Sequence, residues 1–145
     1  MVLKKVAKFL SALRDIPQEK REQFREKLAA EPEFQARIGE NLILLLDRHE
    51  HLQKSLILGL VFGAHIDERI SYEQFQRLAS SIDKAYIGDL EHLADLYATI
   101  PNMDDASAQS LYSAGLVRAE GYSEMQYLRN DLGATLIKIM KNEST

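Results

Sequence analysis

Residues 67–100 read DERISYEQFQRLASSIDKAYIGDLEHLADLYATI, and the apolar run LILGLVF at 56–62 comes just before them. After the opening turn, apolar side chains recur mostly three or four residues apart, which is the period of one helix face. Ser71 and Gln74 have the spacing of a capping box, so a helix should begin there. We expect the two segments to form the central helices of the fold, with four side chains buried: Phe75, Leu78, Ile82 and Leu93.

The composition is that of a globular protein of ordinary domain size. The 145-residue chain is 46% hydrophobic and 28% charged, and its net charge is −4. An acidic balance argues against a general nucleic-acid binder. The absence of cysteine excludes disulfides and thiolate metal sites, and it suits a cytoplasmic protein. No apolar run is long enough to span a bilayer, and the N-terminus does not read as a signal peptide.

Residues 2–16 predict a basic amphipathic helix with a heptad-like stripe of apolar side chains. The polar side carries three lysines, at positions 4, 5 and 8. The apolar face must be covered by the rest of the domain, by a second copy of the chain or by an anionic membrane surface. We therefore treat four members of the stripe as a candidate interface: Val2, Val6, Phe9 and Leu13.

Several residues predict where the helices before and after the central turn begin and end. Pro17 should end the N-terminal helix and sit in the first turn of the next, and Glu31–Pro32 should break that one in turn. Gly39 is expected to act as a hinge before a strongly apolar helix. Further on, Gly88 and Asp89 predict an interruption of the central helix, with Asp89 capping the restarted helix.

The stretch SLYSAGLVRAEGYSEMQYLRNDLGATLIKIM at 110–140 resembles the second half of a winged-helix domain. Its first helix should be capped by Asp104 or Asp105 and should end at Gly115 in the left-handed conformation. Two short strands then flank the turn EGYS, and Asn130 should cap a closing helix. The resemblance implies a small C-terminal β-hairpin on a helical body.

A winged-helix-like end raises the hypothesis of DNA binding. The contacts would come from Gln109 on the reading helix and from Arg118 and Arg129 on the hairpin. The reading helix has no basic residue, however, and residues 101–145 carry four Lys and Arg against six Asp and Glu. We therefore favour a structural or protein-binding role for this unit, with a DNA-binding transcriptional regulator as the alternative.

No group of residues predicts a catalytic, cofactor-binding or metal-binding site. The turn at 67–69 has the surroundings of a calcium loop, but Gly63 and Gln74 stand at the first and twelfth positions, where carboxylates are needed. Two of the four histidines, His49 and His51, have a spacing that places them on different faces of a helix. We expect these histidines to lie on the surface or at the core boundary.

Six segments, spread over nearly the whole chain, carry a further resemblance: FLSALRDIPQEKREQF, LLLDRHEHLQK, LGLVFGAHIDERISYEQFQRLASSID, DLEHL, SAGLV and YLRNDLGATLIKI. Together they resemble a poorly characterised class of bacterial helical proteins that ends in a winged-helix-like unit. The resemblance implies a bacterial source or a bacterial mobile element, and it brings no known activity or functional residue.

The predicted fold is mainly α, a multi-helix domain of seven to nine helices with a small C-terminal β-hairpin. Residues 1–100 form the helical region, and residues 101–145 form the winged-helix-like unit packed on it, in one compact domain. The predicted function is a non-enzymatic protein-interaction or regulatory module of the cytoplasm, which forms a dimer or other homo-oligomer. No cofactor is expected and nucleic acid is disfavoured, while a membrane surface met through residues 2–16 is a further candidate partner.

Overall fold

The structure, a computed structural model, describes residues 2–14, 16–48 and 51–141, without the side chains at 2, 3, 6, 41 and 43–48. Over these residues the chain is mainly α-helical, with nine helices and one two-stranded antiparallel sheet near the C-terminus. The predicted fold class is therefore confirmed. The chain packs as two compact units, unit 1 (Met1–Phe75) and unit 2 (Gln76–Thr145).

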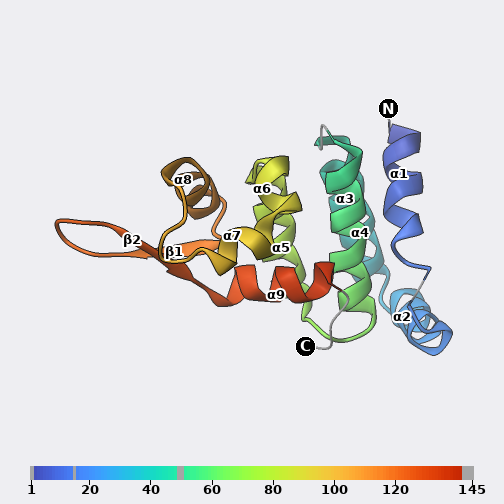
Figure 1. Cartoon of the computed structure of the whole chain (residues 1–145). Coiled ribbons are helices and arrows are strands. Elements are labelled where there is room, and N and C mark those ends of the chain that lie inside the picture. The colour runs from blue at the N-terminus through green and yellow to red at the C-terminus, as the bar shows by residue number, and fades with distance from the viewer. Residues whose placement is uncertain (1, 15, 49–50, 142–145) are drawn as a thin grey trace. The chain divides into compact units, whose positions relative to one another are not determined.

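Each unit is built from consecutive elements, which Figure 1 shows in chain order. Unit 1 contains α1 (Val2–Ser11), α2 (Gln18–Ala30), α3 (Pro32–Arg48), α4 (Leu52–Ile66) and the first residues of α5 (Tyr72–Lys84). Unit 2 contains the rest of α5, then α6 (Ile87–Glu91), α7 (Leu93–Ala98), α8 (Asp105–Ser113), β1 (Val117–Glu120), β2 (Gln126–Arg129) and α9 (Asp131–Met140). The predicted division after residue 100 stays a prediction, since compact packing does not establish which part folds alone.

In unit 1, α1 and the segment that follows it pack against α4 at two glycines that lie one turn apart. A Cβ atom on Gly59 would overlap the carbonyl oxygen of Phe9, and a Cβ on Gly63 would lie 2.9 Å from Cδ1 of Ile16. The Phe9 ring lies 5.6 Å from the ring of Phe62 on α4. Small residues thus let the two helices approach closely, in the way that glycine serves elsewhere.

Aromatic rings fill the rest of the unit 1 core. Phe62 is the central ring, with centroids 5.6 Å from Phe24 and 5.3 Å from Phe75. Phe34 and Tyr72 extend the cluster, with their rings edge-on at 5.7 Å. Edge-to-face pairs of this kind stabilise a core beyond the area that they bury. The cluster draws on α2, α3, α4 and α5, so it holds the four helices together.

Of the four local signals in this region, two are confirmed and one is wrong. The fourth, Pro17, precedes α2 as its N-cap residue, and α1 already ends at Ser11. Ser71 and Gln74 form the capping box: the Gln74 N–H donates to the Ser71 hydroxyl at 3.1 Å, and the Ser71 N–H donates to the Gln74 side chain at 2.9 Å. Pro32 begins α3. Gly39, however, is no hinge, because α3 runs through it without a break. A glycine inside a helix costs only about 1 kcal/mol, and the packing of Phe34 and Ile38 outweighs that.

The first part of unit 2 also differs from what its sequence predicted. The expected interruption at Gly88 and Asp89 falls earlier, because α5 ends at Lys84 and α6 begins at Ile87. Asp89 does not cap a helix. Its carboxylate is buried and instead accepts a hydrogen bond from the Ser107 hydroxyl at 3.2 Å. This tertiary partner, 18 residues away, explains why the cap prediction is wrong.

The buried face of the central helices follows the predicted stripe. The four side chains expected in the core are all buried, with at most 1% exposed: Phe75, Leu78, Ile82 and Leu93. The three tyrosines of the stripe fare differently, since Tyr97 is buried, Tyr72 is half-buried and Tyr86 is 65% exposed. The apolar stripe therefore predicts which side chains are buried, apart from its tyrosines, whose polar hydroxyl groups allow them to lie nearer the surface.

Candidate interaction surface

The end of unit 2 is organised by α8, whose two ends are fixed by local hydrogen bonds. Asp104 caps the helix by accepting from the backbone N–H of Ser107 at 2.9 Å. The hydrogen bonds from Ser107 lower the pKa of Asp104 below its ordinary value, because they stabilise the charged carboxylate. At the other end the Leu116 N–H donates to the Leu111 carbonyl at 2.9 Å, around a left-handed Gly115. Both predicted helix signals are confirmed here.

Tyr97 of α7 ties the start of β1 to α9. Its hydroxyl donates to the carbonyl of Leu116 and lies 3.4 Å from the side-chain oxygen of Asn130. Asn130 caps α9 by accepting from the Gly133 N–H at 2.9 Å, and it donates to the carbonyl of Gly115 at 2.9 Å. Burial raises the pKa of Tyr97, because it disfavours the charged phenolate. The hairpin therefore leaves unit 2 from a base fixed by side-chain hydrogen bonds.

The two strands pair in antiparallel register, and the pairing defines two faces. Val117 lies opposite Arg129, and Ala119 lies opposite Tyr127, on the face that includes the buried Val117. Since side chains alternate along a strand, Arg118 and Glu120 project together from the other face. Figure 1 shows the hairpin extending away from the helices of unit 2.

Large apolar side chains are exposed on α8 and on this hairpin. Tyr112 of α8 is 51% exposed, and its ring meets the ring of Tyr127 edge-on at 6.1 Å. In the loop between the strands, Tyr122 is fully exposed and Met125 is 57% exposed. We call these four side chains the α8–hairpin surface. Exposed apolar side chains that gather on one part of a protein mark interaction sites.

Sequence reasoning missed these four residues, although the turn itself was predicted. A signal was present in the segment EGYSEM at 120–125, which reads as a turn but contains Tyr122 and Met125. Turn residues are usually small and polar, because a projecting turn has no core for a large side chain to enter. A tyrosine and a methionine in such a turn therefore point to contact with another molecule.

The three residues predicted for the nucleic-acid alternative lie on the same part of unit 2. Gln109 is exposed on α8. Arg118 pairs with Glu120 along its own strand, and its Nε donates to the carbonyl of Arg129 at 3.2 Å. The guanidinium of Arg129 donates to the carbonyl of Tyr97 at 2.9 Å. Both arginines are thus engaged by groups of their own chain.

The apolar stripe of α1 has a partner within unit 1. Phe9 is 5% exposed and packs on Phe62, and Leu13 is half-buried beside Gly63 of α4. Two other members of the predicted interface, Val2 and Val6, have side chains outside the described part of the chain. The half of the stripe that is described therefore faces the chain's own α4.

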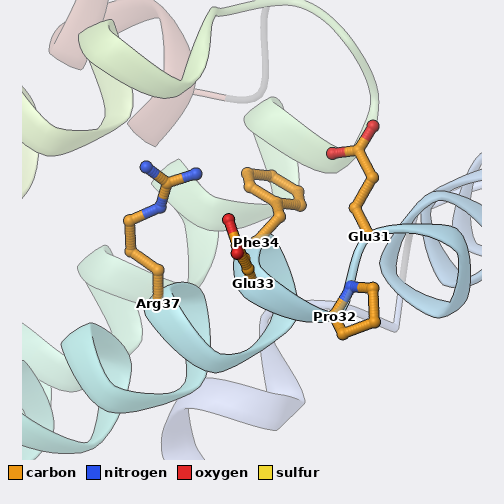
Figure 2. A pocket seen from close by; sticks show the side chains of 5 residues that line it. All are labelled: Glu31, Pro32, Glu33, Phe34 and Arg37. Atoms are coloured by element: carbon orange, nitrogen blue, oxygen red, sulfur yellow. The ribbon is translucent and has the colours of Figure 1, made fainter.

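A surface hollow of about 520 Å³ lies at the start of α3. Its lining is Glu31, Pro32, Glu33, Phe34 and Arg37, and Figure 2 shows the Glu31 and Arg37 side chains on opposite sides of the Phe34 ring. The Arg37 guanidinium lies 5.9 Å from the centre of that ring. Opposite charges at the rim and one aromatic ring do not form a recognisable catalytic arrangement.

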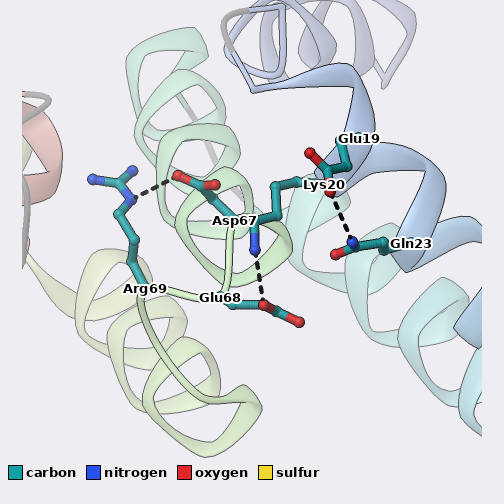
Figure 3. Close-up of polar contacts among 6 residues, drawn as sticks. All are labelled: Glu19, Lys20, Gln23, Asp67, Glu68 and Arg69. Carbon is teal, nitrogen blue, oxygen red and sulfur yellow. Dashed lines mark hydrogen bonds and ion pairs between the residues drawn. The ribbon is translucent and has the colours of Figure 1, made fainter.

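Figure 3 shows a polar cluster where α4 turns into α5. Lys20 of α2 donates to Glu68 at 3.0 Å, and Arg69 lies 3.4 Å from Asp67. The hydrogen bond to Glu68 and the charge of Glu68 raise the pKa of Lys20. Glu68 has a φ of 62°, in the left-handed region that side chains disfavour. This is the turn that invited a calcium prediction, and the described residues hold no group of three or more carboxylate, histidine or cysteine ligands.

His65 differs from the surface histidines His51 and His92, because it lies among aromatic rings. Its ring is 5.5 Å from Tyr72 and 5.7 Å from Phe24, and Nδ1 lies 3.4 Å from the carbonyl of Ile70. Burial lowers the pKa of His65 below 6.5. His49 lies outside the described residues. The described histidines therefore lie in three separate places.

Comparisons with known proteins find no match, so the role of the α8–hairpin surface is inferred from its own residues. A scan against models of protein families finds no match, and searches of curated proteins and of solved structures find none either. The predicted family resemblance thus stays a prediction. Within the described residues, no helix combines the length and the apolar character needed to cross a membrane.

Proposed function

We propose that this protein is a non-enzymatic interaction module that associates with a second copy of itself through the α8–hairpin surface. The observation that carries the proposal is the exposure of Tyr112, Tyr122 and Met125 on α8 and on the hairpin beside it. Tyrosine and methionine contribute large contact areas at interfaces, and both are enriched there. The proposal keeps the predicted class of function and moves the contact surface from α1 to unit 2.

The charges beside this surface favour a protein partner over nucleic acid. Asp104 and Asp105 stand at the start of α8, where a reading helix would meet phosphates, and both are exposed. Arg118 and Arg129 would have to leave Glu120 and a backbone carbonyl to bind a phosphate. Phosphate contacts supply most of the affinity of proteins for DNA, so this surface lacks the main source of that affinity.

Light scattering or sedimentation of the full chain over a range of concentrations tests the proposal. We expect a dimer at high micromolar concentration, and a shift to monomer when Tyr112 and Met125 are both replaced by Ser. Leu10→Ser is the matched control, because Leu10 is a similarly exposed apolar residue on α1. A monomer at every concentration would overturn the proposal. A dimer weakened by the control and not by the double variant would return the interface to α1.

An electrophoretic shift experiment at low salt tests the nucleic-acid alternative, because even non-specific binding appears under that condition. We expect no shift with duplex DNA. A shift that is lost in Arg118→Ala and Arg129→Ala would instead support the DNA-binding regulator. Replacement of Arg77, an exposed arginine of α5 outside the hairpin, provides the control for a general loss of positive charge.

A further inference from the structure

Strand β1 has one edge without a strand partner in the described part of the chain, and Val117 at the start of that edge is buried. Its only strand neighbour there is β2, and no backbone hydrogen bond joins residues 117–120 to any other described segment. An edge strand presents unpaired N–H and C=O groups that can pair with a further strand. Exposed Tyr112 of α8 contacts Tyr127 of the neighbouring strand β2, so apolar surface lies close to this sheet.

The side chains of β1 are ordered so that the strand complements itself. Its sequence is Val117-Arg118-Ala119-Glu120. If two copies pair in antiparallel orientation about a two-fold axis at Ala119, Arg118 of each copy lies opposite Glu120 of the other. Opposite charges in such cross-strand positions stabilise a sheet, and a C2 axis forms the pair twice. Both side chains are exposed on the same face. They pair with each other within one strand, so the cross-strand pairs would exchange or extend that contact.

The small residues of β1 fall where close approach is needed. Ala119 would face its own copy at the axis, and Val117 would face Gly121, which has no side chain. The other edge has no such order, because β2 reads Gln126-Tyr127-Leu128-Arg129 and carries one charge. A two-fold axis on β2 could not bring opposite charges together.

From this juxtaposition we infer that the second copy binds by pairing β1 with β1, which gives a four-stranded antiparallel sheet centred on Ala119. The inference rests on the proposed self-association and specifies its geometry. The sheet order is β2, β1, β1 of the second copy, then β2 of the second copy. Faces are preserved across the axis, so α8 of both copies lies on the same side of the sheet.

Cysteine cross-linking tests the register directly, because the chain contains no cysteine of its own. Ala119→Cys should form a disulfide-linked dimer under mild oxidation, since residues directly opposite in paired strands have Cβ atoms close enough for that bond. Gln126→Cys is the matched control on β2. The two β2 strands would be three strand spacings, or about 14 Å, apart, so this variant should stay uncross-linked.

Charge exchange provides a second test that does not depend on cysteine. Arg118→Glu and Glu120→Arg should each weaken dimerisation about tenfold, because each places like charges opposite one another twice. The double exchange, Arg118→Glu with Glu120→Arg, should restore the wild-type constant. Circular dichroism of each variant establishes that the fold is retained.

The outcomes distinguish the β1 pairing from the proposed self-association on which it rests. A dimer that Ala119→Cys does not trap, or that the charge exchange does not rescue, would overturn the β1 pairing and leave self-association standing. A wild-type chain that stays monomeric would overturn both. Cross-linking of Gln126→Cys as efficiently as Ala119→Cys would show non-specific collision and would overturn the register.

Discussion

Two helices, one in each unit, end with the same hydrogen-bond pattern around different residues. Beyond α4 the N–H of Arg69 donates to the carbonyl five residues earlier, and beyond α8 the N–H of Leu116 does the same, both at 2.9 Å. The residue that turns the chain is left-handed in both, with φ of 62° at Glu68 and 80° at Gly115. Helix ends of this kind usually use glycine.

The difference shows what a side chain can contribute at a strained position. Left-handed backbone costs a non-glycine residue about 1–2 kcal/mol, which Gly115 avoids. Glu68 accepts that cost, and its carboxylate reaches Lys20 of α2, 48 residues away. The end of α8 is instead secured by Asn130, which donates to the carbonyl of Gly115. The end of α4 is thus held by the side chain of its left-handed residue, Glu68, whereas the end of α8 is held by the side chain of Asn130.

The largest effect on stability is expected from replacing Asn130, whose side chain secures the end of α8. Asn130→Ala should lower the free energy of unfolding by about 2–3 kcal/mol, because it removes the cap of α9 and the hydrogen bond to Gly115. Urea denaturation measures the change. Asn130→Asp keeps the capping acceptor and loses only the donor, so it should cost less. Equal losses in the two variants would assign the whole effect to the donated hydrogen bond.

Exchanging the turning residue should have the next largest effect. Gly115→Glu copies the residue of the α4 end into a position with no Lys20 equivalent, and it should destabilise by about 1–2 kcal/mol. Gly39→Ala is the control, since a Cβ there meets nothing within 4 Å and the residue is inside a helix. That control should stabilise by about 0.5–1 kcal/mol. If Gly115→Glu were neutral, left-handed strain would not distinguish the two helix ends.

The reverse exchange should stabilise slightly. Glu68→Gly removes the left-handed strain and an exposed ion pair worth little, so the net gain should be about 0.5–1 kcal/mol. A double-mutant cycle with Lys20→Ala separates the two terms. Lys20→Ala should matter in the wild type and have no effect in the Glu68→Gly background. A destabilised Glu68→Gly would mean that the ion pair outweighs the strain.

The smallest effect should be a pH dependence confined to the α4 end. Burial lowers the pKa of His65 below 6.5, so the neutral ring is favoured in the folded state. The resulting stability is fully present above pH 6.5 and is lost as the pH falls below that value. Amide exchange at Arg69 should quicken below pH 6.5 relative to Leu116, after correction for intrinsic rates. The difference should disappear in His65→Leu.

The sequence predicted the helix signals that depend on neighbouring residues. The Ser71 capping box, the Asp104 and Asn130 caps and the left-handed Gly115 all involve partners within about one turn, so local spacing reveals them. Asp89 shows the limit, because its hydrogen-bond partner is Ser107 of another helix. A local pattern cannot distinguish a cap from a tertiary contact.

The candidate surface was less visible in the sequence for the same reason. The hairpin could be predicted from its turn, but the exposure of Tyr112 depends on which face of α8 the hairpin covers. The interface predicted on α1 stays a prediction. The sequence left open whether the rest of the domain, a second copy or a membrane covers the stripe, and in the structure Phe9 lies against Gly59 of α4. An apolar stripe shows that a partner exists, and only the tertiary structure shows which partner it is.

The packing of α1 on α4 also bears on the order in which unit 1 is completed during synthesis. Phe9 cannot be buried until Phe62 has left the ribosome, because the two rings pack directly on each other. Until then the apolar stripe of α1 stays exposed on the nascent chain, which is a state open to chaperone binding and aggregation. Pausing of translation before residue 62 has left the ribosome should therefore lengthen that exposure, and pausing after α4 has left it should not.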